Sequence, residues 1–423
     1  MTMQVAFQTL GCRLNEAETE AWARQFRAAG AAVVPAAQAD VVVLNTCAVT
    51  GEAARKSRQW VRRLRRANPR ARLVVSGCYA TLHPEQVARE LGVDLVVPNH
   101  DKDHLVERVR QLLPFAAAPT ETPVFPRSRQ RAFVKVQDGC RHRCTFCIVT
   151  VARGEERSRP IDAVVAEIRA LRAGGVQEAV LSGVHLGGYG SDLGVSLTDL
   201  LAAVLARTDL PRLRLGSLEP WELDEGFFAL FENPRLMPHL HLPLQSGSDA
   251  VLKRMARRCR VDDFRELVRL ARRYRPDLVL TTDIIVGFPG ETEADFERTL
   301  ALVAEIGFAH VHIFPYSPRE GTAAAAFPGQ VDERIKKARC RRLHELAARL
   351  RRRALEAHVG RTAAVLWEKA ETRAGRTGFS GYTPHYLRAW TAVAPEADLG
   401  NRIQTVRLTG VAPEGDRLIA EPV

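Results

Sequence analysis

Three closely spaced cysteines carry the strongest chemical signal in this sequence. They are Cys140, Cys144 and Cys147, in the spacing CxxxCxxC. They lie directly after a predicted strand over Ala132–Gln137. Thiolates are the usual protein ligands of iron–sulfur clusters, and three of them on one loop leave the fourth iron of a cubane open. An open position predicts a catalytic metal centre. The alternative is a structural zinc site completed by Cys259 or His142.

Three further cysteines share one kind of position near the start of the chain. They are Cys12, Cys47 and Cys78. Each comes directly after a predicted strand, so all three are expected to gather at one edge of a parallel sheet, where ligands usually bind. Three converging thiolates can hold a second cluster with one free iron. The alternative is that they are three ordinary buried cysteines. Cys259 and Cys340 lie in basic helical surroundings and suggest no site.

The composition restricts the class of protein. The 423 residues include 46% hydrophobic and 26% charged residues, which is typical of a soluble globular protein of more than one domain. The sequence shows no signal peptide and no apolar run long enough to cross a bilayer. We therefore expect a cytoplasmic protein without membrane contact, in which cysteines bind metals rather than form disulfides. The net charge of +12 favours a polyanionic partner.

The first 113 residues are expected to form an α/β domain. Strands are predicted at Gln4–Leu10, Val41–Asn45, Leu73–Ser76 and Leu95–Val97. Amphipathic stretches at Glu16–Ala29 and Ala53–Ala67 predict helices between them. Because the strands are continuously apolar, they indicate a parallel sheet that is covered on both faces. Residues 114–130 carry several prolines and little periodicity, which predicts a linker.

Residues 131–330 alternate strands with helices and predict an open or closed parallel (β/α) barrel. Six strands are expected, at Ala132–Gln137, Glu178–Ser182, Arg212–Gly216, His239–Pro243, Val279–Val286 and His310–Pro315. Helices are expected between them, at Ile161–Ala173, Leu197–Ala206, Val261–Tyr274 and Glu293–Ile306. In such barrels the chemistry takes place at the carboxyl ends of the strands.

The remaining chain predicts a basic helix and a small β domain. Residues 331–359 form the helix, in which ten arginines and lysines stand against four acidic residues. Residues 360–423 show short β segments with glycine turns, which suits a small antiparallel β barrel. A second basic run, from Arg55 to Arg66, lies on a predicted helix of the first domain. Such runs are usually solvated faces, but together they offer a track for RNA phosphates.

The cysteine loop at the start of a predicted barrel resembles that of the radical S-adenosylmethionine superfamily. This resemblance implies that Cys140, Cys144 and Cys147 hold a [4Fe-4S] cluster whose open iron binds S-adenosylmethionine and cleaves it to a 5′-deoxyadenosyl radical. Phe146 matches the aromatic position that contacts the adenine, although a core role is an equally good interpretation. The loop departs from the family's pattern at Thr150-Val151, where members commonly have Pro-Tyr.

Further positions are assigned to the S-adenosylmethionine site by the same resemblance. They are Ser182, Gly183, Ser217, Glu219 and Gln245. All five lie at or near predicted carboxyl ends of strands, so they face the mouth of the barrel. For each of them, the alternative is a role in a turn or a helix cap.

Two three-cysteine sites followed by a small β domain resemble the methylthiotransferase family over essentially the whole chain. The resemblance implies a second [4Fe-4S] cluster on Cys12, Cys47 and Cys78 that supplies or carries sulfur. It also implies that residues 360–423 are a TRAM domain, a small RNA-binding β barrel. Several segments, including Thr9-Leu-Gly-Cys-Arg-Leu-Asn15 and Ser182-Gly-Val-His185, are similar to the branch acting on N6-threonylcarbamoyladenosine in tRNA.

This resemblance implies transfer of a methylthio group to C2 of that adenosine, at position 37 beside the anticodon. The implied partners are a tRNA anticodon stem-loop and a flavodoxin or ferredoxin type electron donor, and we expect a monomer. Two alternatives keep the chemistry and change the substrate, to N6-isopentenyladenosine in tRNA or to an aspartate of a ribosomal protein. A third, from another class, is a zinc-stabilised RNA-binding protein without catalysis.

Overall fold

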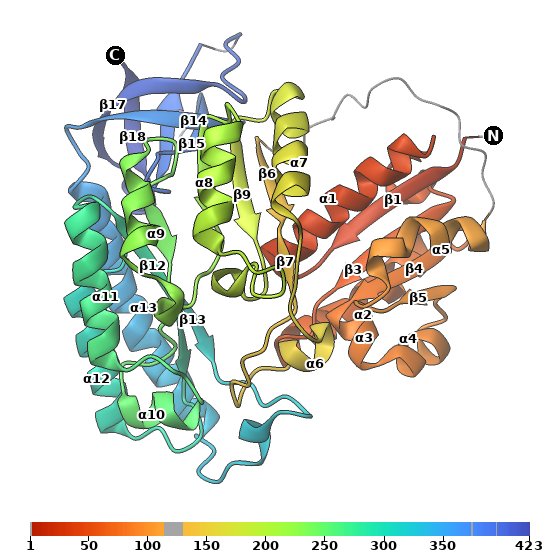
Figure 1. Ribbon diagram of the computed structural model, residues 1–423, viewed down its shortest axis with the longest axis horizontal. Coiled ribbons are helices and arrows are strands. Elements are labelled where there is room, and N and C mark those ends of the chain that lie inside the picture. Colours follow the sequence, from red (N-terminus) through yellow and green to blue (C-terminus); the bar gives the residue numbers. More distant parts are fainter. Residues whose placement is uncertain (1, 114–129, 374, 395) are drawn as a thin grey trace.

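The computed structural model describes residues 2–113, 130–373, 375–394 and 396–423. Figure 1 shows an N-terminal α/β unit, a central barrel-like unit and a C-terminal β barrel. The predicted linker, residues 114–130, lies outside the described residues except for Gln130. No helix in the described part of the chain is long and apolar enough to cross a membrane.

The N-terminal unit is a five-stranded parallel sheet, as its apolar strands predict. Its order is β2 (Ala32–Val33), β1 (Gln4–Thr9), β3 (Val41–Thr46), β4 (Arg72–Gly77) and β5 (Leu95–Val97). Apolar residues of α1 (Arg13–Ala28) and α5 (Leu105–Leu112) cover one face of the sheet. The other face is covered by α2 (Gly51–Ala67), α3 (Cys78–Leu82) and α4 (Pro84–Glu90). The short strand β2 was not predicted.

The central unit holds six parallel strands in two three-stranded sheets. The first has the order β10 (Arg212–Leu215), β9 (Glu178–Ser182) and β6 (Arg131–Lys135). The second has the order β11 (His239–His241), β12 (Val279–Val286) and β13 (His310–Pro315). The isolated bridges Leu213–Leu236 and Ser217–His241 connect the two sheets. The prediction of a six-stranded parallel (β/α) barrel is thus confirmed, in its open form.

Helices pack on the outer side of these strands and enclose the main core. They are α7 (Ile161–Ala173), α8 (Leu197–Arg207), α11 (Val261–Tyr274) and α12 (Glu293–Ile306). Their apolar positions pack with every second residue of the strands, such as Val134 and Leu181. The intervening strand residues face the interior of the barrel, because side chains alternate along a strand.

Helix α1 of the N-terminal unit packs against this interior side. Ala17 of α1 forms a small buried cluster with Phe133 of β6 and Val180 of β9. Phe133 and Val180 alternate with residues that pack on the outer helices. The N-terminal unit therefore covers the inner face of the first sheet, and α1 lies beside β6 in Figure 1.

One predicted strand of the barrel is interrupted in the structure. The segment Ala132–Gln137 is divided into β6 and the short β7 (Gln137–Asp138), which pairs antiparallel with β8 (Arg157–Ser158). The chain leaves the barrel sheet at this point, and the amide of the Gln137 side chain donates to the carbonyls of Asp138 and Gly139. After this turn, the cysteine loop lies at the end of the barrel.

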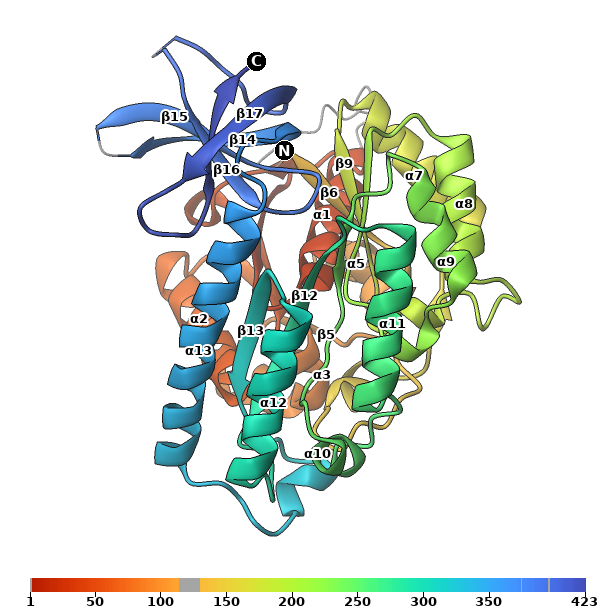
Figure 2. The same ribbon diagram turned by 90° about the vertical axis from the view of Figure 1, so that its left-hand side faces the viewer.

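The C-terminal unit follows α13 (Glu333–Glu356), which runs along the molecule in Figure 2. Its five strands close into a barrel, in the order β14 (Thr362–Arg373), β15 (Arg376–Tyr382), β16 (Arg388–Ala392), β18 (Leu418–Pro422) and β17 (Ile403–Val411). The predicted small barrel is confirmed. It is antiparallel except between β16 and β18, which pair parallel. The β segments predicted at Ala363–Glu368, Tyr386–Thr391 and Arg402–Gly410 correspond to β14, β16 and β17, whereas β15 and β18 were not singled out.

Part of the positive charge on α13 is used for packing rather than for solvation. Lys336 is buried and donates from Nζ to the carbonyl of Tyr316 at 3.1 Å. Arg339 is also buried and pairs with Glu291 at 2.7 Å. The helix is therefore anchored to the barrel by two of its cations.

Candidate functional site

The barrel cysteines lie on one loop at the carboxyl end of β6 and β7. The N–H of Cys140 donates to the carbonyl of Gly154 at 3.1 Å, and the N–H of Cys147 donates to the carbonyl of Cys144 at 3.0 Å. Burial, together with the neighbouring thiols of Cys147 and Cys144, raises the pKa of Cys140 to about 12. Burial likewise raises the pKa of Cys147 to about 11. The structure thus brings three predicted ligands together in a place that needs a cation to ionise them.

A buried arginine supplies part of that positive charge. Arg257 donates from Nη1 to the sulfur of Cys144 at 4.0 Å, and its guanidinium lies 4.5 Å from the ring centre of Trp221. Its Nη2 pairs with Glu219 at 2.7 Å. Glu219, which was predicted at the S-adenosylmethionine site, therefore lies beside the cysteine loop and is held by Arg257.

The tight turn before Cys140 depends on a glycine. Gly139 has φ +75°, and a Cβ there would lie 1.8 Å from the carbonyl oxygen of Glu155. We expect Gly139→Ala to displace the cysteine loop and to destabilise the protein by more than about 2 kcal/mol, because backbone strain and a backbone collision add. Iron content after reconstitution and the urea midpoint measure this effect.

The matched control is Gly194→Ala. Gly194 has φ +70°, and a Cβ there would meet nothing within 4 Å. This substitution measures the cost of the left-handed conformation alone. We expect it to lower the free energy of unfolding by about 1 kcal/mol and to leave the iron content unchanged. Equal effects of the two substitutions would show that the close approach at Gly139 does not matter.

The N-terminal cysteines also come together, at the carboxyl ends of three neighbouring strands. Cys12 caps α1, Cys47 follows β3 and Cys78 opens α3 directly after β4. Burial, together with the neighbouring thiols of Cys12 and Cys78, raises the pKa of Cys47 to about 11. Gly11 permits the close approach, because a Cβ at φ +111° would lie 3.0 Å from the sulfur of Cys47. The predicted convergence of these three thiols is therefore observed.

Both cysteine groups are wider than a site for one zinc ion. Around a tetrahedral zinc, thiolates at about 2.3 Å from the metal lie roughly 4 Å apart. Among the described residues, the groups whose potential ligand atoms all lie within 4.8 Å of one another include neither cysteine triad. Cys259, a proposed fourth zinc ligand, is buried in the barrel core. His142, the other, has its Nε2 at 3.0 Å from Nε2 of His185. Neither triad therefore has the spacing of a single-ion site, whereas Cys140 has it with Glu156 and His185. Three thiolates are the donor set that an iron–sulfur cluster takes.

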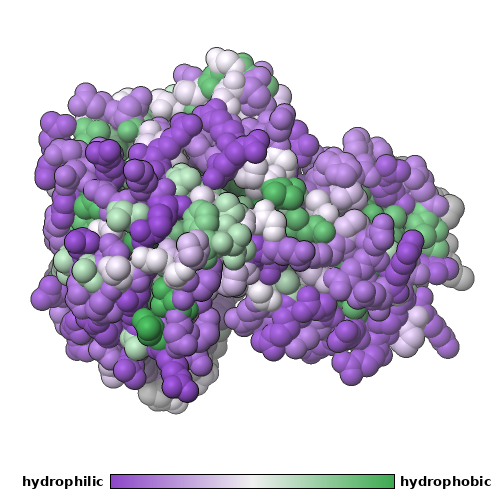
Figure 3. All heavy atoms as spheres, turned by 90° about the horizontal axis from the view of Figure 1, so that it is seen from below, coloured by the Kyte–Doolittle hydropathy of each residue, from purple (hydrophilic) through white to green (hydrophobic). Residues whose placement is uncertain are grey.

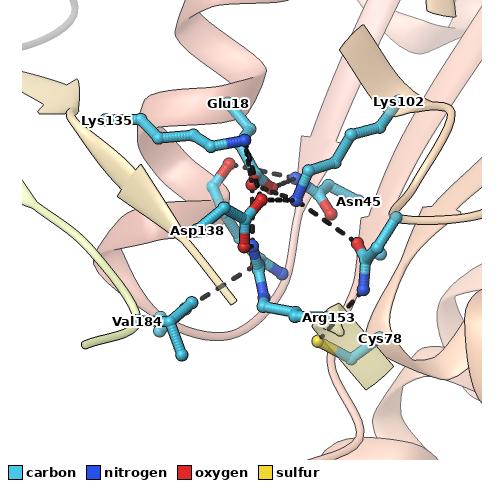
Figure 4. Close-up of polar contacts among 12 residues, drawn as sticks. Glu18, Asn45, Cys78, Lys102, Lys135, Asp138, Arg153 and Val184 are labelled. Carbon is cyan, nitrogen blue, oxygen red and sulfur yellow. Dashed lines mark hydrogen bonds and ion pairs between the residues drawn. The ribbon is translucent and has the colours of Figure 1, made fainter. Parts of the chain in front are cut away.

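A buried network of charges joins the two cysteine sites (Figure 4). The guanidinium of Arg153 donates to Glu18 at 2.8 Å and to Asp138 at 3.0 Å. Lys102 pairs with both carboxylates, and the distance from its Nζ to Asp138 is 2.8 Å. Lys135 pairs with Asp138 at 2.8 Å. Glu18 and Lys102 belong to the N-terminal unit, so the network fixes that unit to the cysteine loop of the barrel.

One cation of the network, Arg153, also acts on the N-terminal thiols. The other two cations, Lys102 and Lys135, pair with the same buried carboxylates, and Lys135 pairs in addition with the exposed Asp103 at 3.7 Å. Arg153 interacts electrostatically with Cys12 and Cys78. Asn99 donates to the sulfur of Cys78 at 3.7 Å and to the carbonyl of Ala152 at 2.7 Å. A cluster held by thiolates is anionic, so this surrounding favours it.

The network predicts how stability depends on acid. Burial alone raises the pKa of Glu18, but Arg153, Lys102 and Lys135 outweigh it and lower the pKa from 4.5 to about 2. A carboxyl with a lowered pKa stabilises the fold above its unfolded value and loses this contribution as the pH falls. We therefore expect Glu18→Gln to be less stable than wild type near neutral pH. The gap in their urea midpoints should close between pH 4.5 and about 2. A gap independent of pH would contradict this account.

The predicted S-adenosylmethionine residues lie around the same end of the barrel. Ser182 ends β9. Gly183 allows the side chain of Gln137 to approach the backbone, because a Cβ at position 183 would lie 2.9 Å from Oε1 of Gln137. Ser217 follows β10 and is exposed. Gln245 adopts φ 70°, which is strained for a residue with a side chain and is common at ligand sites. All of these residues lie at this end of the barrel.

Phe146 is only partly buried. Its ring lies 6.5 Å from that of Phe288, centre to centre, and it packs at the edge of a small apolar cluster. The departure at Thr150-Val151 is accommodated in the short helix α6 (Val149–Arg153). There the hydroxyl of Thr150 donates to the carbonyl of His142 at 2.9 Å. The substitution therefore preserves an ordered loop.

Sequence reasoning missed the buried network. Glu18, Lys102 and Asp138 were not singled out, because isolated charged residues normally lie on the surface. Arg153 lies shortly after the departure at Thr150-Val151, and nothing in its local sequence indicates a buried ion pair. The proximity of Asp138 and Arg153 to the cysteine loop was the one available signal.

Comparisons with known proteins agree with this architecture. Residues 4–98 match the model of "Uncharacterized protein family UPF0004", and residues 134–303 match that of the Radical SAM superfamily. A solved radical S-adenosylmethionine methyltransferase, TsrM from Kitasatospora setae, superposes with a TM-score of 0.56 at 16% identity. That superposition covers 77% of each chain. At this identity the likeness concerns the fold alone.

Curated relatives are more closely similar. The threonylcarbamoyladenosine tRNA methylthiotransferase MtaB of Thermotoga maritima is 37% identical over 97% of this chain and 95% of its own. The protein of the same name from Bacillus subtilis is 37% identical over 91% of this chain and 89% of its own. The chain therefore belongs to the threonylcarbamoyladenosine tRNA methylthiotransferase family of radical S-adenosylmethionine proteins.

Proposed function

We propose that this chain transfers a methylthio group to C2 of N6-threonylcarbamoyladenosine at position 37 of tRNA. The single observation that carries the proposal is the pair of cysteine triads joined through Arg153 in a chain of this family. Arg153 lies six residues after Cys147 and also interacts with Cys12 and Cys78. The two sites therefore belong to one interface rather than to independent domains.

Each triad has a separate task in this proposal. Cys140, Cys144 and Cys147 hold the [4Fe-4S] cluster that binds S-adenosylmethionine, and Cys12, Cys47 and Cys78 hold the second. With both clusters and S-adenosylmethionine bound, the enzyme has radical chemistry and a sulfur source for an unactivated C–H bond. The residues that contact S-adenosylmethionine are Phe146, Ser182, Gly183, Ser217, Glu219 and Gln245.

The base must enter where the barrel mouth meets the N-terminal unit. Figure 3 shows this side of the molecule, on which pale and hydrophobic residues gather between two largely hydrophilic lobes. Val49, Val151 and Phe314 are 45%, 63% and 41% exposed, and the first two follow cysteines of the two triads. An apolar surface suits an unstacked base, whereas hydrogen bonds and charge would serve its substituent.

RNA phosphates are bound by the basic surfaces around this mouth. Helix α2 begins four residues after Cys47, and its N-terminal Gly51 donates to the hydroxyl of Ser317 at 3.3 Å. Its exposed arginines and lysine include Arg55, Lys56, Arg62 and Arg66. These side chains and the C-terminal barrel would hold the anticodon stem-loop through its backbone.

The remaining parts of the proposal concern organisation and partners. Residues 1–113 carry the sulfur site, 131–330 the radical site, 331–359 the connecting helix and 360–423 the RNA-binding barrel, with 114–130 as linker. A flavodoxin or ferredoxin type protein supplies electrons, and the enzyme acts as a cytoplasmic monomer.

Nucleoside analysis of cellular tRNA tests the proposed function. A strain whose copy of this gene is deleted should retain threonylcarbamoyladenosine but lack its methylthio derivative. Methylthiolated isopentenyladenosine should be unaffected. The wild-type gene should restore the missing nucleoside. Persistence of the methylthio derivative in the deletion strain would contradict the substrate assignment.

A further inference from the structure

The inner face of the second barrel sheet carries a group of polar side chains outside both cysteine sites. These residues are His241 of β11, Thr281 and Asp283 of β12, and His310 and His312 of β13. They alternate with Leu280, Ile284, Val311 and Ile313, which pack in the outer core. His241 is fixed in place, since its Nε2 lies 3.2 Å from Asp283 and its Nδ1 lies 2.9 Å from the hydroxyl of Thr281.

The histidines of β13 are held less firmly than His241. Among the described residues, neither His310 nor His312 has a side-chain hydrogen bond or ion pair, although a ring nitrogen of His312 lies within 4.8 Å of Asp283. Both side chains are exposed, and their ring centres lie 4.4 Å apart. Burial and the neighbouring imidazole of His312 lower the pKa of His310 to about 4, and burial also lowers the pKa of His312. Both imidazoles are therefore neutral near pH 7 and offer ring N–H donors rather than positive charge.

Arg13 adds a cation to this group from the opposite domain. It follows Cys12 directly, and its guanidinium lies 5.1 Å from the ring centre of Phe133 on the inner face of β6. Its charge acts on His312 and lowers the pKa of that imidazole, after burial and together with His241. Its one ion pair, with Glu16 at 3.0 Å, is exposed to solvent. Arg13 and His312 thus face one space, directly beside the N-terminal cysteine site.

We propose that Arg13 and His312 bind the carboxylate of the threonylcarbamoyl group, while Asp283 accepts a hydrogen bond from its hydroxyl or a ureido N–H. The inference rests on the proposed function and names the residues that recognise the substituent. The group offers a cationic donor in Arg13, a neutral imidazole donor in His312 and a carboxylate acceptor in Asp283, which matches a substituent carrying a carboxylate, a hydroxyl and N–H donors. An apolar isopentenyl group would leave all three unpaired, so the site rejects it.

Binding measurements with three anticodon stem-loops test this assignment. The loops carry threonylcarbamoyladenosine, its threonyl methyl ester, or unmodified adenosine, and affinities are measured on the anaerobically reconstituted protein. We expect Arg13→Met and His312→Leu each to weaken binding of the first loop about 10-fold to 100-fold and to leave the unmodified loop unchanged. Arg269→Gln is the matched control, because Arg269 is an exposed cation on α11 that pairs with the exposed Glu266 of the same helix.

The methyl ester and the His312→Leu substitution together form a double-change cycle. A general loss of folding would not give the result expected for this cycle. Wild type should bind the ester loop more weakly than the threonylcarbamoyl loop, by a factor similar to that of the substitution. His312→Leu should bind the ester loop little more weakly than wild type does, because both changes remove the same contact. Full iron content of both variants shows that the neighbouring clusters are intact. Independent, multiplicative losses would overturn the proposal, as would equal losses on the unmodified loop.

Two outcomes separate this inference from the proposed function. If wild type fails to methylthiolate the threonylcarbamoyl loop, the proposed function is wrong. If wild type does so and both variants keep their preference for that loop, only the carboxylate assignment is wrong. A bound metal ion that is lost in His312→Leu would also overturn it, because His241, Asp283 and His312 are close enough to share one ion.

Discussion

Replacing Cys140, Cys144 and Cys147 together by alanine is expected to abolish cleavage of S-adenosylmethionine and transfer of the methylthio group. The three thiols lie on one loop, so their removal leaves no protein ligand for that cluster. Iron and acid-labile sulfide after anaerobic reconstitution should fall from about eight to about four per chain. Activity should fall below detection, which corresponds to a loss of more than about a thousandfold.

The reciprocal variant separates the two sites. Replacing Cys12, Cys47 and Cys78 by alanine should likewise halve the iron, but cleavage of S-adenosylmethionine should continue without methylthio transfer. Cys259→Ala and Cys340→Ala are the controls and should retain about eight irons, since neither cysteine lies in a triad. Four irons in the wild type, or zinc in their place, would contradict the two-cluster account.

The second large effect is expected from Arg153→Met. Arg153 is buried and contacts Glu18, Asp138 and Asn15 at 2.8, 3.0 and 2.7 Å. Its removal takes one charge-assisted hydrogen bond from each of two buried carboxylates, Glu18 and Asp138, and leaves Lys102 and Lys135 as their remaining cationic partners. Breaking a buried ion pair from one side typically costs about 3–5 kcal/mol. The urea midpoint should fall accordingly, and the N-terminal cluster should be lost more readily than the barrel cluster.

Arg207→Met is the control for this substitution. Arg207 pairs with Asp162 at 2.7 Å, but both side chains are solvent-exposed. Exposed pairs contribute less than about 1 kcal/mol, so its urea midpoint should change little. If Arg153→Met is as stable as Arg207→Met, the buried network does not hold the two units together.

The positions of the six clustered cysteines were predictable because strand topology determines them. Carboxyl ends of parallel strands meet at one edge, so Cys12, Cys47 and Cys78 could be placed together from strand predictions alone. The loop of Cys140 follows the first barrel strand for the same reason. The prediction needed only apolar runs and the residue after each run, and both are local features of the sequence.

The interface between the units was not predictable in this way. The contact of α1 with β6 and β9 depends on Ala17, Phe133 and Val180, which are distant in sequence and ordinary in type. The inner histidines of β13 were also overlooked, because they were counted simply as strand residues. Both features arise from which face of a strand meets which domain, and single-strand periodicity does not contain that information.

Strand β15 shows a different reason for failure. It contains Gly378 and Gly381, and glycine normally weakens a strand. In the closed barrel a Cβ at either position would lie 2.3 Å from a backbone oxygen of the neighbouring strand. The glycines are therefore required by close packing over the rings of Trp390 and Trp367. The low strand propensity of glycine disfavours a strand here, but the close packing of the barrel requires glycine at both positions, and the strand forms.

A competition between two substrates tests the central claim most directly. The reconstituted chain is incubated with S-adenosylmethionine, a reductant, and two stem-loops in one tube, carrying threonylcarbamoyladenosine and isopentenyladenosine. Nucleosides are then identified by mass spectrometry. The account predicts methylthio transfer to threonylcarbamoyladenosine alone, and none with the variant that lacks Cys140, Cys144 and Cys147. Methylthiolated isopentenyladenosine, or product from that variant, would contradict it.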